Sequence, residues 1–271
     1  MNFTIVIILL ILILLICIYL TFEYSLLMPS VKGLPILMYH KVSTQKNDSI
    51  TICVDKLEKQ FNFFKRKNYN TISFVDLKEH LLTDKKLPSN PMIITFDDGY
   101  LNNYKLAFPL LKKFKFKATV FLPVAYIGKK NEWDEGQEEI VGFNIIKELS
   151  ESGLIDFGLH SYRHQSYENM KIEDIENDLK LCIKILDENA VEYIKVLAYP
   201  FGGFPRRNPK LNKQMKEIFG KHNIDFALRI GSRINKFPFK DNYELKRINM
   251  RGSDKIFEFK IKMKKGRTRL F

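Results

Sequence analysis

The sequence predicts an α/β domain of parallel strands, preceded by one N-terminal transmembrane helix. Two observations carry this prediction. From residue 34 onward, short apolar runs alternate with stretches of helical periodicity, and an uncharged run of mostly Ile and Leu occupies the N-terminus. Alternation of this kind is typical of βα units. The roughly 240 residues after the N-terminal run fit one domain, because α/β barrels reach that length without splitting.

The N-terminal run carries no charge between Asn2 and Phe22. A helix over residues 3–22 would cross a hydrocarbon core of about 30 Å. The run lacks the basic start and the small-residue cleavage site of a signal peptide, so an uncleaved single-pass anchor is favoured over a removed signal. Residues 23–33 are expected to form a tether and residues 34–271 the folded domain. Only the amino group flanks the N-terminal side, so charge leaves the orientation in the membrane open.

Seven apolar runs are short enough for buried strands, and they lie near residues 34–39, 91–96, 116–122, 155–159, 194–199, 224–228 and 245–249. Strands that are apolar on both faces are typical of parallel sheets covered by helices. Helices are expected around residues 54–67, 74–82, 140–150 and 171–190. In the last of these, apolar residues recur on one face, as in a helix that packs against a sheet.

Two adjacent carboxylates follow the run at 91–96, in Thr95-Phe96-Asp97-Asp98-Gly99. Gly99 permits a turn at the end of the strand, and successive side chains of a strand point to opposite faces. Asp97 and Asp98 can therefore take different roles at the rim where the chemistry of strand–helix barrels collects. The alternative is that Asp-Asp-Gly is an ordinary turn after a strand.

Two imidazoles follow the run at 155–159, in His160-Ser161-Tyr162-Arg163-His164. One Asp and two His make a three-ligand divalent-metal site with room left for water, and the second Asp is then free to act as a base. Imidazole with one carboxylate suits zinc, with cobalt, nickel or iron as further possibilities. The two motifs together predict metal-assisted hydrolysis.

With Thr-Phe-Asp-Asp-Gly and His-Ser-Tyr-Arg-His, the chain resembles the polysaccharide deacetylases of the NodB-homology type. Residues 116–122 are similar to that family's second core strand, and Tyr199-Pro200-Phe201-Gly202 resembles its third motif. The resemblance covers about residues 34 to 250. It implies a distorted or incomplete (β/α) barrel of about seven strands.

The resemblance also implies a reaction, the hydrolysis of an N-acetyl group from an amino sugar with release of acetate. Asp97 would be the catalytic base, and the metal ligands would be Asp98, His160 and His164. The backbone N–H of Phe201 would stabilise the oxyanion together with the metal, with Tyr199 of the same motif beside the substrate. Such an activity places the domain outside the cytoplasm.

Two departures from the commonest family pattern concern the general acid and the group that orients the base. His222 is the only His after the third motif, and it lies at a polar helix end. His40 is the better candidate for the acid, because residues 34–42 resemble the N-terminal motif of the biofilm poly-N-acetylglucosamine deacetylases; the alternative is a structural role. Ala198 stands where many members have Arg, as in the biofilm subgroup, so Arg247 is the candidate that orients Asp97, unless it is a solvated surface charge.

Trp133, the single tryptophan, lies in a polar loop and could stack on a sugar ring, or else anchor the loop. The formal net charge is +13, and six basic residues and no acid lie between Lys260 and Arg269. No nucleic-acid recognition motif accompanies this charge, so nucleic acid is not an expected partner. The basic tail could touch anionic lipid or glycans, or be a solvated disordered end.

The sequence thus predicts a membrane-anchored, metal-dependent deacetylase whose domain is extracytoplasmic. The expected partners are the membrane and an N-acetylated glycan, with poly-N-acetylglucosamine favoured. Peptidoglycan, chitin fragments and a lipid-linked sugar remain open as substrates. A non-catalytic glycan-binding domain on the same fold is the alternative from another functional class.

Overall fold

Parallel strands form a closed barrel in the computed structural model, which describes residues 3–24, 30–134 and 136–268. The first strand of the barrel pairs with the second strand on one side and with the last strand on the other, which closes the ring. The strands follow one another around the ring in chain order: β1 (Ile36–Tyr39), β5 (Pro91–Phe96), β6 (Ala118–Leu122), β7 (Ile155–Leu159), β8 (Val196–Ala198), β9 (Phe226–Ile230) and β10 (Leu245–Asn249). The predicted seven-stranded (β/α) barrel is confirmed, and all seven expected runs contribute a strand.

Three very short strands lie outside the ring. β4 (Asn70–Thr71) extends the sheet beside β5, whereas β2 (Lys41–Ser43) and β3 (Thr51–Cys53) pair with each other in a separate parallel ribbon. Pieces of two or three residues have no periodicity of their own, so the sequence does not predict them.

Apolar side chains fill both sides of the barrel wall. Alternate strand residues such as Ile36, Phe121 and Leu228 gather in one buried cluster with Phe74 of helix α3 (Phe74–Leu82). The intervening strand residues join a second, larger cluster with the surrounding helices. Burial of both strand faces is what the continuous apolar runs predict.

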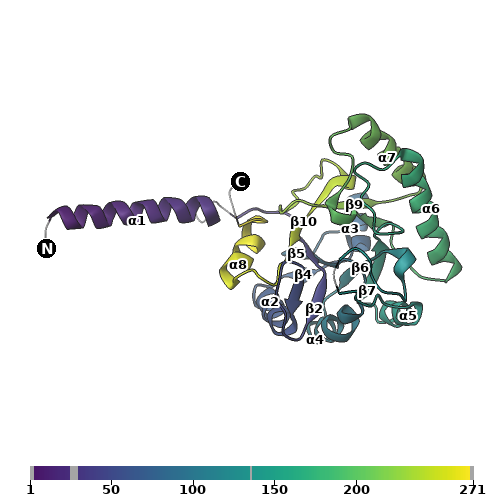
Figure 1. The fold of residues 1–271 in the computed structure, drawn as a ribbon, viewed down its shortest axis with the longest axis horizontal. Helices are drawn as coiled ribbons and strands as arrows, with labels where there is room; N and C mark the ends of the chain where they lie inside the picture. The colour runs from purple at the N-terminus through teal and green to yellow at the C-terminus, as the bar shows by residue number, and fades with distance from the viewer. Residues whose placement is uncertain (1–2, 25–29, 135, 269–271) are drawn as a thin grey trace.

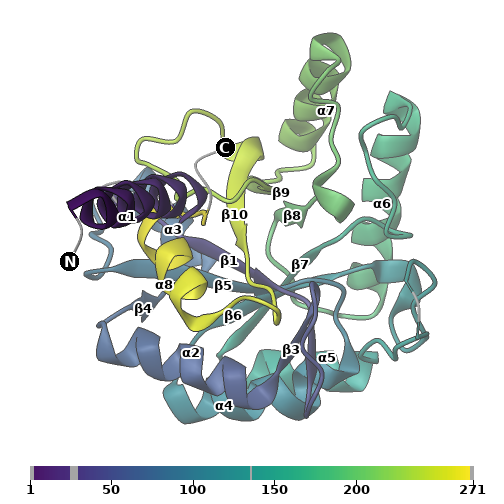
Figure 2. The same ribbon diagram turned by 60° about the vertical axis from the view of Figure 1, so that its left-hand side comes forward.

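Helices surround the barrel (Figure 1), and Figure 2 shows α2, α4 and α5 along one side with α6 and α7 on another. In α6 the expected apolar face is buried, including Ile175, Leu179 and Leu186. The helices are α2 (Val54–Arg66), α4 (Phe108–Phe114), α5 (Phe143–Glu151), α6 (Ile172–Glu188), α7 (Pro209–Lys221) and α8 (Ile256–Lys265). Single helical turns are Asn103–Ala107, Val124–Tyr126, Pro200–Gly202 and Asn242–Glu244.

The basic C-terminal segment packs against the barrel and is not a solvated end, within the residues that the structure describes (up to residue 268). Residues 256–265 form α8, which buries Phe259 and Met263 in the larger apolar cluster. The Lys262 ammonium donates to the Asp254 carboxylate and to the carbonyl of Asn249. Amphipathic packing and these contacts hold the segment against the barrel.

The N-terminal run forms helix α1 (Phe3–Tyr24), which extends away from the barrel (Figure 1). Its segment Phe3–Leu20 has a mean hydropathy of 3.4 and none of it is buried against the rest of the chain. By length and composition α1 can cross a membrane, but a signal sequence has the same properties, so the anchor stays a prediction. Residues 25–29 of the expected tether lie outside the described residues, and Val31 already donates to the Lys264 carbonyl.

Candidate active site

The predicted site residues gather at one end of the barrel. Because the strands are parallel, their carboxyl ends share a rim, and segments from β1, β5, β7, β8 and β10 meet there. A cavity of about 300 Å³ opens at this rim, lined by residues that include His40, Asp97, Asp98, Trp133, Phe201 and Arg247. Residues far apart in the sequence therefore line one site.

Asp98, His160 and His164 form a compact, buried cluster. One oxygen of Asp98 lies 3.3 Å from Nε2 of His160 and 3.1 Å from Nε2 of His164. The potential ligand atoms of all three residues lie within 4.8 Å of one another. Each residue is at most 6 % exposed.

The donor set fits a divalent transition metal. Oδ1 of Asp98 is buried and has no hydrogen bond of acceptable geometry in the described part of the chain, although two imidazoles face it. His160 Nδ1 lies 2.7 Å from the carbonyl of Ala198, a contact that leaves the Nε2 lone pair free for a metal. Two imidazole nitrogens and one carboxylate oxygen suit zinc and leave a coordination position open.

The protonation tendencies of the cluster follow from burial and close charges. Burial opposes ionisation of Asp98, but both imidazoles outweigh it and hold the pKa of Asp98 well below its usual range. Burial lowers the pKa of His164. Burial also acts to lower the pKa of His160, yet the carboxylates of Asp97 and Asp98 raise it overall.

A tight turn after β5 sends the two adjacent carboxylates in different directions. Asp98 (φ 71°) and Gly99 (φ 63°) both adopt the left-handed conformation. At Gly99 a Cβ atom would lie 2.7 Å from a methyl carbon of Leu122, so glycine is required there by both its φ angle and its packing. Left-handed backbone at a non-glycine residue such as Asp98 is a strained feature that clusters at functional sites.

Asp97 is held by Arg247 and not by the cluster of Asp98, His160 and His164. The two guanidinium nitrogens of Arg247 donate to the two carboxylate oxygens of Asp97, at 2.5 and 2.7 Å. Arg247 is fully buried and Asp97 is 2 % exposed. Burial acts to raise the pKa of Asp97, but Arg247, His160 and His40 together lower it. The carboxylate is therefore ionised and oriented, and Arg247 is not a solvated surface charge.

His40 follows β1 and lines the cavity close to the same carboxylate. Its Nε2 lies 3.8 Å from Oδ2 of Asp97, and its side chain is 19 % exposed. The His40 carbonyl accepts a hydrogen bond from the Asn103 side chain, which holds the backbone at this position. His222 lies away from the site, where its ring faces Glu176.

Aromatic side chains border the cluster of Asp98, His160 and His164. The Trp133 ring stacks on His164 with centroids 4.2 Å apart, and its indole N–H donates to the hydroxyl of Tyr100. Phe201 is 63 % exposed, adopts a left-handed conformation (φ 57°) and contacts the His164 ring. Tyr199 borders the cavity, but its side chain is fully buried and its hydroxyl donates to the Tyr243 carbonyl. Contact between the Tyr199 hydroxyl and a substrate is therefore not supported.

Sequence reasoning missed two polar residues at the site. Asp178 of α6 accepts hydrogen bonds from the Tyr162 backbone and the Tyr167 hydroxyl, which ties the His160–His164 loop to the helix. A carboxylate on the apolar face of a predicted helix was the available signal. Asn249 ends β10 and lines the cavity, and its side-chain oxygen has no partner among the described residues. Its position at a strand end was the corresponding signal.

The family profile for polysaccharide deacetylases matches residues 84–218 of this chain. A Staphylococcus aureus (strain MRSA252) protein named poly-beta-1,6-N-acetyl-D-glucosamine N-deacetylase is 26% identical over 83% of this chain and 76% of its own length. YxkH of Bacillus subtilis (strain 168), which carries a provisional name as a polysaccharide deacetylase, is 29% identical over 63% of this chain. That match spans 57% of YxkH, so it covers little more than half of the relative.

Among solved structures, the Streptococcus pyogenes deacetylase PplD in complex with acetate has the same fold. Its TM-score is 0.68, at 22% identity over 83% of this chain and 95% of PplD. The likeness covers the barrel at low sequence identity, so it supports the fold. The family profile, the named relatives and the shared fold all agree with the two motifs at the rim of the barrel. The chain belongs to the polysaccharide deacetylase family.

Proposed function

We propose that this protein is a metal-dependent N-deacetylase of an amino-sugar polymer, with poly-β-1,6-N-acetylglucosamine as its substrate. One observation carries the proposal. The cluster of Asp98, His160 and His164 lies beside a second carboxylate, Asp97, that is ionised and held by Arg247. The name of the S. aureus relative supports the choice of substrate.

Asp98, His160 and His164 would hold the metal, most suitably zinc, with cobalt, nickel or iron as alternatives. When bound, a divalent cation supplies Lewis acidity toward an amide carbonyl and lowers the pKa of water. The cavity of about 300 Å³ has room for the acetamido group of one sugar and a water molecule.

The chain's own side chains supply the proton transfers. Asp97 accepts a proton from the attacking water as the carbon–oxygen bond forms, and Arg247 fixes both carboxylate oxygens in place. The backbone N–H of Phe201 donates to the oxygen that becomes negative. His40 then donates a proton to the amine nitrogen as the carbon–nitrogen bond breaks. The products are acetate and a free amino sugar.

We further propose that α1 anchors the chain in a membrane and that the barrel lies outside the cytoplasm. The length and apolarity of α1 support the anchor. The extracytoplasmic side follows from the proposed substrate, because a glycan polymer of the cell envelope is found there. Trp133 is half-buried and lines the cavity, and in this proposal it stacks on a sugar ring of the substrate.

The decisive experiment is acetate release from a panel of glycans, with and without a chelator. The panel holds poly-N-acetylglucosamine, peptidoglycan, chitin fragments and a lipid-linked amino sugar. We expect chelator-sensitive release from poly-N-acetylglucosamine above all. Binding of these glycans without any acetate release would instead identify a non-catalytic glycan-binding domain.

Two variants test the assigned roles. Asp97→Asn should still fold, at reduced stability, and keep its metal content but lose acetate release, because the amide cannot accept the proton. Normal release from this variant would contradict the assigned base. His40→Ala should lower turnover by about 10²–10⁴-fold while metal content is spared. A matching loss of metal would assign His40 a different role.

A further inference from the structure

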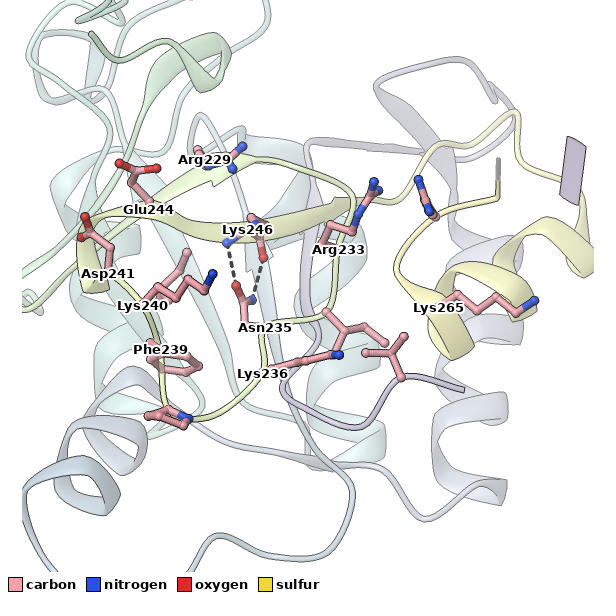
Figure 3. A pocket seen from close by; sticks show the side chains of 15 residues that line it. Arg229, Arg233, Asn235, Lys236, Phe239, Lys240, Asp241, Glu244, Lys246 and Lys265 are labelled. Carbon is pink, nitrogen blue, oxygen red and sulfur yellow. Dashed lines mark hydrogen bonds between the residues drawn. The ribbon is translucent and has the colours of Figure 1, made fainter. Parts of the chain in front are cut away.

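The outer face of β9 and β10 is flanked by a connection without an α-helix, unlike the other connections between successive barrel strands. The connection between these strands, residues 231–244, contains only the short turn Asn242–Glu244. In place of a helix, the Asn235 side chain bonds the backbone N–H and carbonyl of Lys246 (Figure 3). A pocket of about 510 Å³ remains on this face.

Basic side chains dominate this pocket, which we call the basic pocket. Lys246 and Arg229 are register partners on β10 and β9. They alternate with Arg247, which points into the barrel, so their own side chains face outward. The chain that crosses the outer face contributes Arg233, Lys236 and Lys240. Figure 3 shows these groups around the same opening.

The two acids of the basic pocket form their ion pairs with a lysine outside it, and Glu244 acts on Arg229 and Lys246 only from a longer distance. Asp241 and Glu244 both contact the ammonium of Lys216, at 2.5 and 2.9 Å, and Lys216 is not part of the lining. Figure 3 places both carboxylates at one end of the pocket. Within the described residues, none of the lysines and arginines that line the basic pocket has a carboxylate within 4.0 Å.

The cations repel one another at this site. Burial lowers the pKa of Lys246, and the charges of Arg229, Arg233 and Lys240 lower it further. Burial and the charge of Arg267 likewise lower the pKa of Arg233. The buried Nε of Arg229 has no hydrogen-bond partner among the described residues. An anion in the pocket would relieve this repulsion.

The position of the basic pocket in the chain favours an anion at a membrane surface. Val31 belongs to the lining and lies seven residues after Tyr24, the last residue of α1. An extended chain of that length reaches at most about 25 Å. With α1 in a membrane, the basic pocket therefore stays close to the lipid headgroups, whatever path the intervening residues take.

We propose that the basic pocket binds the phosphate of an anionic phospholipid headgroup and thereby orients the barrel on the membrane. Guanidinium groups bind phosphate with two parallel hydrogen bonds, which suits Arg229 and Arg233. A neutral acetylated glycan offers no matching charge, and its cationic deacetylated product would be repelled. Free phosphate has the same chemistry, so the test must separate the two sources.

The test uses the full-length chain in lipid nanodiscs, where α1 keeps it bound whatever the lipid composition. Hydrogen–deuterium exchange of residues 229–246 is compared between discs of phosphatidylcholine alone and discs with 30% phosphatidylglycerol. We expect exchange to slow at least about fivefold with the anionic lipid. Equal exchange in both discs would overturn the proposal. Equal protection from millimolar inorganic phosphate in phosphatidylcholine discs would overturn the lipid assignment.

The variant pair Arg229→Gln/Lys246→Gln should abolish this protection. Lys184→Gln/Lys213→Gln is the matched control, because it removes the same charge from exposed lysines of α6 and α7 and should leave the protection intact. Protection that survives in the first pair would refute the site. If circular dichroism shows that this pair does not fold, Lys236→Gln/Lys240→Gln takes its place, since both lysines are exposed. The readout is exchange, so it does not depend on the proposed deacetylation.

Discussion

The pairing of Asp97 with Arg247 yields a quantitative prediction about stability. Both groups are buried and make two short charge-assisted hydrogen bonds, at 2.5 and 2.7 Å. Arg247→Met leaves the Asp97 carboxylate buried without a counter-charge. Loss of one partner from a buried pair destabilises a protein by about 3–5 kcal/mol.

The magnitude depends on which partner is removed and how. Arg247→Lys keeps the charge but loses the two-pronged geometry, so it should cost about 1.5–3 kcal/mol, the value of one hydrogen bond to a charged group. Asp97→Asn combined with Arg247→Met removes both charges. The double variant should lose no more free energy of unfolding than the more destabilising single variant. The coupling free energy between Asp97 and Arg247 would then be about 3 kcal/mol.

Urea denaturation of the full-length chain in a non-ionic detergent measures these values. Far-UV circular dichroism reports the whole barrel, while fluorescence of the single Trp133 reports the site. Coincident transitions would justify a two-state treatment. Additive effects of the two single changes, within about 0.5 kcal/mol, would refute the idea that the pair acts as a buried unit.

Two further predictions concern the same rim. Burial raises the pKa of Asp178 from 3.8 to about 6, so its neutral form stabilises the fold. That contribution, about 3 kcal/mol, is complete below about pH 4 and is lost as the pH rises through about 6. In Asp178→Asn the free energy of unfolding should fall less between pH 4 and pH 7 than in the parent chain, and parallel curves would contradict this. Zinc should stabilise the chelated protein by about 2.7 kcal/mol at a hundred times its Kd, measured as a rise in Tm, and Asp98→Asn should lose this rise. A rise of the same size in Asp98→Asn would place the zinc elsewhere.

Much of the fold was predictable because its signals are local. Each barrel strand is a short apolar run bounded by polar residues, and each of the seven expected runs overlaps a strand. β2, β3 and β4 were not predicted, because two or three residues show no periodicity and pair only when neighbouring segments are in place. The basic segment that could have been a solvated end became α8, because Phe259 and Met263 find a core to pack against.

The sequence alone determined which residues could ligate a metal. Asp97 and Asp98 are adjacent and the two histidines are four apart, so both motifs are legible in short stretches of chain. Only the tertiary structure decided the partner of the neighbouring carboxylate. Arg247 lies 150 positions from Asp97, and in the sequence it cannot be told from a surface charge. Closure of the barrel brings β10 beside β1 and β1 beside β5, which places the guanidinium inside the ring and away from water, where its charge is satisfied by Asp97.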